Sequence, residues 1–196
     1  MFRGTFYAAY GKDLHADWMK SRYHGAEATG SGWIQDYRLL FQGNLWKETV
    51  NLIPQSGFRV PVGIWYLPFC KMMQDDIQNH LCMETMIMEL GEGQFPIIVY
   101  TRKRKEKRQV PSMRLYQSML SGYQEFGLPV KELDEAAFRC CSSGWERRWR
   151  RRVYQFCSNE EVVRLPLQIQ GVIIRKVRCS MPEQTALKND SVGRTY

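Results

Sequence analysis

The chain has 196 residues, 44% of them hydrophobic, and a formal net charge of +8, which predicts one domain with a substantial core. No apolar run approaches the roughly 18 residues of a membrane-spanning helix, and the N-terminus lacks the apolar segment of a secretory signal. We therefore expect a soluble or peripheral protein inside the cell.

The six cysteines fall at irregular spacings without a CxxC pair, and the chain has only three histidines. This pattern argues against a zinc site and against a dense disulfide framework. We expect free thiols in a reducing compartment, the cytosol or the mitochondrial matrix, and we expect neither a metal nor another cofactor.

The positive charge is concentrated in two segments. Residues 101–116 have a net charge of +6 and residues 139–152 a net charge of +5, so the rest of the chain carries −3 of the total of +8. We interpret the protein as a mildly acidic body to which two basic segments are attached.

The first predicted elements are a buried strand, "GTFYAAYG", and a short amphipathic helix in "DLHADWMKSRY". Between them lies Gly11, for which two interpretations stay open. It marks a simple turn, or it lets a loop bring backbone N–H groups close to a ligand.

A series of strands follows. "WIQDYRLLFQG" and "TVNLIPQSG" predict a strand pair, and "VPVGIWYLP" predicts a further strand that ends at Pro68. "CKMMQDDIQNHL" has the pattern of a short helix. "ETMIMEL" and "FPIIVYTRK" then predict two strands joined by a turn at Gly91–Gly93.

Two helices come next. In "SMRLYQSMLSGYQEFG", Pro111 and Ser112 signal the start of a helix, Leu115, Met119 and Tyr123 form an apolar stripe, and Gly127 signals its end. "VKELDEAAFRCC" predicts the second helix. Strands first and helices later, with short connections, favour an α+β domain.

In this order of elements the sequence resembles the γ-glutamylcyclotransferase-like family over about residues 4–135. The resemblance rests on "AYGKDL", "WMKSR", "DYRLLFQG", "VPVGIWYLP" and, most specifically, "PSMRLYQSMLSGYQEFGLP". It implies a small mixed β-barrel with flanking helices, here followed by a basic C-terminal extension. It also implies a cavity lined by the opening loop, which comprises Tyr10, Gly11, Lys12, Asp13 and Leu14.

The chemistry implied by the resemblance is intramolecular acyl transfer, in which the α-amine of a γ-glutamyl substrate attacks its own γ-carbonyl and releases 5-oxoproline. The amine must first lose a proton to a positioned carboxylate. In the family this group is a Glu in a Leu-Asp-x-x-Glu-Gly segment. Aligning "DDIQNH" with that segment matches Asp76 to the Asp and places Asn79 at the Glu, and an amide is not a base. We therefore expect no catalytic residue, with Asp76 and Glu84 as fallback candidates.

The loop is altered as well, because Lys12 and Asp13 replace the Ser-Asn of the family. Asp13 puts a negative charge where the carboxylate of a substrate should dock. Together with Asn79, this predicts a pseudoenzyme.

The basic segments suggest a polyanionic partner. We expect "TRKRKEKRQ" to be a solvated hairpin or loop, and "WERRWRRRVYQF" to be a helix with Trp145, Trp149 and Val153 on one face. RNA backbone is the favoured partner, an acidic protein surface or anionic lipid are lesser options, and a solvated basic face is the simplest alternative. The predicted polyanion-binding residues are Arg102, Lys103, Arg104, Lys105, Lys107, Arg108, Arg147, Arg148, Arg150, Arg151 and Arg152.

The last part, "EEVVRLPLQIQGVIIRKVRCS", predicts two further strands or an extended arm. Its Val and Ile residues are candidates for packing against another subunit, or the segment completes the barrel. We divide the chain into a domain over residues 1–138, an extension over 139–182 and a disordered tail over 183–196.

Three functions follow from these observations. The first is a catalytically degenerate cyclotransferase fold that serves as a structural or interaction subunit of a larger, RNA-containing assembly. The second is an active γ-glutamyl cyclotransferase. The third is a sensor that keeps the cavity for a γ-glutamyl ligand without turnover.

Overall fold

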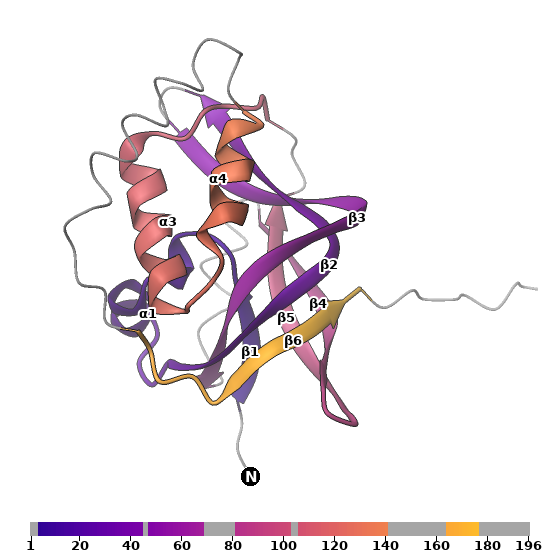
Figure 1. Cartoon of the computed structure of the whole chain (residues 1–196). Coiled ribbons are helices and arrows are strands. Elements are labelled where there is room, and N and C mark those ends of the chain that lie inside the picture. The colour runs from indigo at the N-terminus through magenta and orange to yellow at the C-terminus, as the bar shows by residue number, and fades with distance from the viewer. Residues whose placement is uncertain (1–3, 45–46, 69–80, 103–105, 141–163, 177–196) are drawn as a thin grey trace, which may run out of the picture.

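The computed structural model in Figure 1 describes residues 4–44, 47–68, 81–102, 106–140 and 164–176. Within these residues, six strands close into a barrel in the order β1-β3-β2-β6-β4-β5. The strands are β1 (Gly4–Ala9), β2 (Glu27–Asn44), β3 (Lys47–Pro68), β4 (Leu81–Leu90), β5 (Gly93–Arg102) and β6 (Ile169–Arg175). Pairing is antiparallel except for β1 with β5 and β2 with β6, so the barrel is mixed, as predicted.

Strands β2 and β3 form one long hairpin. β3 runs through both "TVNLIPQSG" and "VPVGIWYLP", which the sequence pattern had divided into two strands. The Pro and Gly residues that suggested a break lie at an irregularity of the ladder instead, where the register shifts between Gln35 and Tyr37. β4 begins at Leu81, three residues before the predicted "ETMIMEL".

Strand β6 closes the barrel. It pairs in parallel with β2 and antiparallel with β4, and Val172 and Ile174 are buried in the common core. Of the two interpretations of this segment, completion of the barrel is confirmed. The prediction that its Val and Ile residues are exposed for another subunit is wrong for Val172 and Ile174, because period-two alternation turns them inward. One strand, and not two, lies within residues 164–176.

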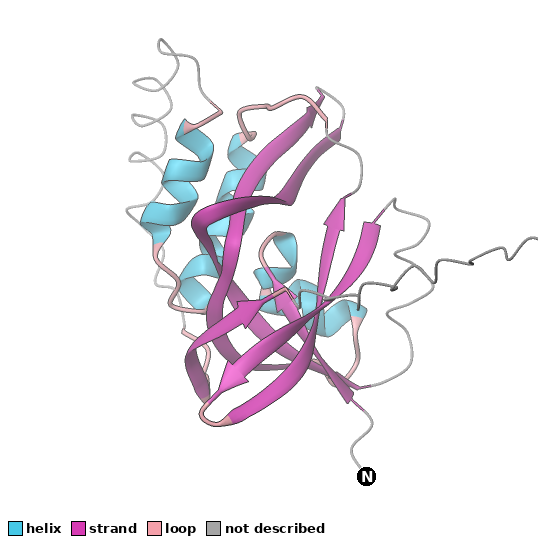
Figure 2. Cartoon of the chain, turned by 90° about the vertical axis from the view of Figure 1, so that its right-hand side faces the viewer, coloured by secondary structure: helices cyan, strands magenta, loops and turns pink. Residues whose placement is uncertain are grey.

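The helices lie together on one side of the barrel, as Figure 2 shows. They are the 3₁₀ turn η1 (Lys12–Leu14), α1 (Ala16–Arg22), α3 (Met113–Glu125) and α4 (Val130–Phe138). None of the helices in the described residues is long and apolar enough to cross a membrane.

Helix α3 has the predicted ends. The Ser112 hydroxyl oxygen accepts a hydrogen bond from the Leu115 N–H at 3.2 Å, which caps the start. At the other end Gly127 has a φ of +63°, and the Leu128 N–H donates to the Tyr123 carbonyl at 2.7 Å, a Schellman motif. Met119 and Tyr123 are fully buried, which confirms most of the predicted stripe.

Helix α3 also packs closely on η1. A Cβ added at Gly122 would lie 2.4 Å from the Leu14 Cβ, so only glycine allows this approach. The contact fixes the turn after β1 against the helix. Of the predicted helix over 70–81, residues 70–80 lie outside the described residues, and Leu81 begins β4. The helix in "WERRWRRRVYQF" and the tail over 183–196 lie wholly outside them.

Candidate functional site

A cavity of about 330 Å³ lies beside the turn that follows β1. Its wall carries charges of both signs, from elements that are far apart in the sequence. The cationic side chains are Lys12, Arg22 and Arg102, and the acidic ones are Asp13 and Glu48. Such a wall suits a small ligand that itself carries both charges.

The turn that forms one side of the cavity is short and tight. The Leu14 N–H donates to the Gly11 carbonyl and the His15 N–H to the Lys12 carbonyl, each at 3.1 Å. The N–H groups of Lys12 and Asp13 are therefore not used within the turn. Gly11 has a φ of −121°, which is not the positive φ that favours glycine. What glycine leaves is space, because an added Cβ would have only the Val50 Cβ within 4 Å.

Asp13 is held in place from two sides. The Tyr7 hydroxyl donates to its Oδ2 at 2.7 Å, and the Trp18 indole N–H donates to its Oδ1 at 3.1 Å. The Lys12 ammonium lies 4.4 Å from the centroid of the Trp18 ring, a cation–π contact. Both oxygens of the carboxylate thus have donors, and Asp13 is oriented as part of the wall.

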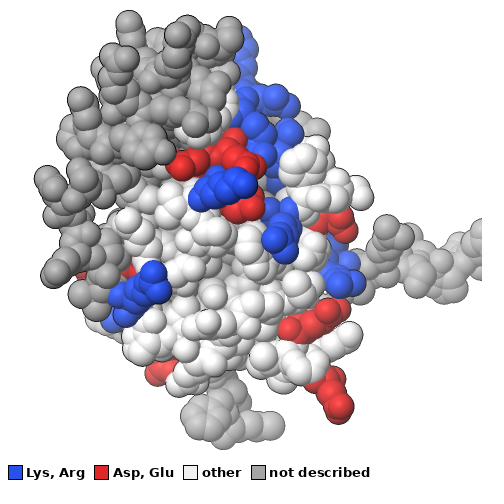
Figure 3. Space-filling view, viewed as in Figure 1, with Lys and Arg blue, Asp and Glu red and all other residues white. Residues whose placement is uncertain are grey.

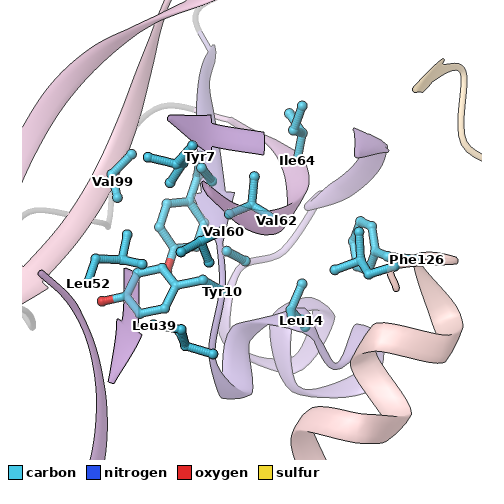
Figure 4. Packing of buried hydrophobic residues seen from close by; sticks show 14 of the residues in the cluster. Tyr7, Tyr10, Leu14, Leu39, Leu52, Val60, Val62, Ile64, Val99 and Phe126 are labelled. Atoms are coloured by element: carbon cyan, nitrogen blue, oxygen red, sulfur yellow. The ribbon is translucent and has the colours of Figure 1, made fainter. Parts of the chain in front are cut away.

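Two buried tyrosines support this arrangement from inside the barrel. Burial, together with the neighbouring Asp13 carboxylate, raises the pKa of Tyr7 well above its usual range, so Tyr7 stays a neutral donor. The Tyr10 hydroxyl donates to the Tyr100 carbonyl at 2.5 Å. Figure 4 shows both rings directed into the apolar interior near Val60 and Val62.

Glu48, which the sequence analysis did not single out, is the second carboxylate of the cavity. It lies at the start of β3, opposite Gly43 in the hairpin. Its Oε1 accepts a hydrogen bond from the Ser112 N–H at 3.1 Å, at the N-terminus of α3. Its Oε2 has no hydrogen-bond partner among the described residues. Its only signal in the sequence was a charged residue just before an apolar strand, which is too common to identify a site.

The comparisons with known proteins bear on the fold. A solved γ-glutamyl cyclotransferase matches 68% of this chain and 86% of its own, with a TM-score of 0.59 and 18% identity. An uncharacterised protein from Homo sapiens matches to the same extent. The chain has the γ-glutamylcyclotransferase-like fold. YkqA from Bacillus subtilis matches 70% of this chain and 54% of its own, with a TM-score of 0.58 and 13% identity. No protein-family model and no curated protein matches the sequence.

Four of the five residues of the predicted opening loop line the cavity. Tyr10, Gly11, Lys12 and Asp13 line it, whereas Leu14 is fully buried beneath it against α3. Asn79 and Asp76, at the expected position of the base, lie outside the described residues.

Glu84, the other fallback candidate, lies in a different cavity, of about 430 Å³, which is lined by residues of β2, β3, β4 and β5 and by Lys176. Its carboxylate accepts hydrogen bonds from Thr101 Oγ1 at 2.8 Å, Lys176 Nζ at 2.9 Å and the Tyr37 hydroxyl at 3.2 Å. Burial by itself would raise the pKa of Glu84, but the hydrogen bonds from Lys176 and Thr101 outweigh it and hold the pKa below the usual range. This cluster ties β6 to β4, because Lys176 directly follows the last strand.

The predicted polyanion-binding residues are only partly described. Arg102 lines both cavities, and Lys107 and Arg108 are exposed on a segment that pairs with the end of β2. The others lie outside the described residues: Lys103, Arg104, Lys105, Arg147, Arg148, Arg150, Arg151 and Arg152. In the described part of the chain, no group of three or more His, Cys, Asp or Glu side chains could hold a metal ion.

Proposed function

We propose that this protein binds a small γ-glutamyl compound in the cavity beside Gly11 and does not turn it over at the rate of an enzyme. The observation that carries the proposal is the mixed charge of the cavity wall. A γ-glutamyl group ends in an α-carboxylate and an α-ammonium. In this proposal Arg22 and Arg102 bind the α-carboxylate, and Glu48 binds the α-ammonium.

We expect no fast turnover because the carboxylates weighed for the role of general base are engaged elsewhere. Cyclisation needs a carboxylate that accepts the proton of the α-ammonium. Asp13 already accepts two hydrogen bonds, and Glu84 faces another cavity with Lys176 as its partner. The resemblance puts an amide, Asn79, at the expected place.

One observation favours the alternative, an active γ-glutamyl cyclotransferase. Glu48 lines the cavity, and among the described residues its Oε2 has no partner. A carboxylate that lines the cavity, is oriented by the Ser112 N–H and has one oxygen without a partner among the described residues is able to act as a general base. Such help is typically worth about 10²–10⁴-fold in rate.

We further propose that the chain is an interaction subunit of an RNA-containing assembly. The support is the basic composition of residues 101–116 and 139–152. We place it in a reducing compartment, the cytosol or the mitochondrial matrix, in keeping with Cys82 and Cys140 as free thiols.

Binding and turnover are measured side by side. Titration calorimetry with γ-glutamyl-alanine is expected to show binding by the wild type, and Gly11→Ala is expected to weaken it about tenfold or more, because the new methyl group takes up cavity space. Glu92→Gln removes a carboxylate in the exposed turn after β4, outside the lining of this cavity, and is the control variant. Equal affinity of Gly11→Ala and the wild type, or no binding at all, refutes the ligand proposal.

Release of 5-oxoproline is followed in the same samples. We expect none above the uncatalysed rate. Sustained release that Glu48→Gln lowers by about 10²-fold or more, while Glu92→Gln does not, overturns the pseudoenzyme proposal and makes the protein a cyclotransferase with Glu48 as its base.

A further inference from the structure

A cluster of arginines lies on a surface separate from the cavity beside Gly11. Arg38 comes from β2, Arg59 from β3 and Arg139 from the end of α4, and all three line a cavity of about 230 Å³. Figure 3 shows basic side chains gathered on this side of the molecule, next to a smaller acidic group. In the sequence Arg38 and Arg59 are isolated, Arg139 begins the basic segment 139–152, and no pattern links the three.

The irregularity of the β2–β3 hairpin builds this surface. Between the pairs Gln35–Arg59 and Tyr37–Pro54, the single residue Asp36 faces residues 55–58. Asp36 and Gly57 both have positive φ, and the Gly57 N–H donates to Asp36 Oδ1 at 2.9 Å. The bulge turns the next residue, Phe58, outward.

Phe58 gathers two of the arginines around its ring. The guanidinium carbons of Arg38 and Arg139 each lie 5.9 Å from the ring centroid. Arg59 lies 4.1 Å from the centroid of the Trp33 ring. Aromatic contacts of this kind orient guanidinium groups and leave their N–H donors available.

The charges of the cluster are only partly balanced. Glu132 and Glu135 line the same cavity, and Glu135 is shared between Arg139 at 3.7 Å and Lys131 at 3.9 Å. Arg38 forms no ion pair with any described residue. Burial, followed by the charges of Arg108 and Arg139, lowers the pKa of Arg38. Like charges brought together in this way favour the binding of an anion.

Tyr123 gives a second, independent indication of a ligand. The residue is fully buried, lines the cavity, and its hydroxyl has no hydrogen-bond partner among the described residues. Buried hydroxyl groups are nearly always paired. The hydroxyl is closed off from solvent, so an oxygen atom of a molecule bound in the cavity would provide the missing acceptor after a small shift of the side chains around Tyr123.

We propose that Arg38, Arg59 and Arg139 form a binding site for a phosphate group, with the Tyr123 hydroxyl as a further donor. Phosphate fits because guanidinium groups bind its oxygens with two parallel hydrogen bonds and carry the compensating charge. The phosphate comes from an RNA backbone or from a small phosphorylated compound. The first source rests on the proposed RNA-containing assembly, and the second does not.

The test compares two probes, pyrophosphate and a short poly(U) RNA. The wild type is expected to bind both, and Arg38→Gln and Arg139→Gln are each expected to weaken binding by about tenfold. The slope of log affinity against log salt for RNA is expected to fall by roughly one for each arginine removed. Arg175→Gln, an exposed arginine of β6 paired with Glu89, removes the same charge elsewhere and is the control.

Tyr123→Phe separates binding from stability. It removes the unpaired hydroxyl and keeps the ring, so thermal stability is expected to stay the same or rise, while affinity for pyrophosphate falls several-fold. A variant that loses stability and affinity together contradicts the role of the hydroxyl.

The outcomes also separate this site from the proposed assembly. RNA binding and pyrophosphate binding that are each equal in the wild type and in the Arg38 and Arg139 variants refute the site and leave the assembly standing. Equal RNA binding beside pyrophosphate binding that depends on these arginines supports the site with a small phosphorylated compound as its ligand. Pyrophosphate binding that depends on these arginines, without RNA binding, supports the site and refutes the assembly. Binding of neither probe refutes both.

Discussion

Gly122 lies where helix α3 comes closest to the turn that carries Lys12 and Asp13, and Gly122→Ala tests that contact. A Cβ at this position would lie 2.4 Å from the Leu14 Cβ and 3.0 Å from the Leu14 carbonyl carbon. Both neighbours are fixed to the backbone, so neither rotates away. Overpacking of this kind costs about 3 kcal/mol, and alanine regains about 1 kcal/mol of helix propensity.

The net expectation is therefore a loss of about 2 kcal/mol in the free energy of unfolding, which lowers Tm by about 4–8 °C in a protein of this size. Urea denaturation followed by circular dichroism measures it. Gln117→Ala, on the exposed face of the same helix, is expected to change stability by less than about 0.5 kcal/mol. Because the turn must shift, affinity for γ-glutamyl-alanine is expected to fall as well. A Gly122→Ala protein that is as stable as the wild type would show that α3 does not hold the turn in this way.

Two further predictions concern closure of the barrel by β6. Because the folded-state pKa of Glu84 lies below its unfolded value of about 4.3, its contribution to stability is full at neutral pH and is lost as pH falls below about 5 through the folded pKa. Glu84→Gln is therefore expected to lower stability at pH 7 and to flatten the acid side of the stability profile, and an unchanged profile contradicts the Glu84–Lys176 pairing. Ile174→Ala is expected to cost about 2–4 kcal/mol in urea denaturation, because the side chain is fully buried, and a loss under about 0.5 kcal/mol means that β6 does not pack in the core.

The local features of this protein were readable in its sequence. The ends of α3 are marked by Ser112 and Gly127, whose effects act within one helical turn, and the structure has both. The alternation of apolar residues predicted the strands. These signals depend on neighbours along the chain, so one sequence is enough to recognise them. The mixed barrel with flanking helices was implied by the resemblance to the γ-glutamylcyclotransferase-like family, and the structure has it.

Only the tertiary structure decided where distant residues meet. Propensity does not reveal that β3 continues through its bulge, or that β6 inserts between β2 and β4, because both depend on pairing across the sheet. Glu48 reaches the cavity through its bond to the first turn of α3, sixty-four positions away. Arg38, Arg59 and Arg139 likewise become one surface when the hairpin packs against α4. A candidate site is a relation between folded elements, and such relations follow from packing and not from the residue order alone.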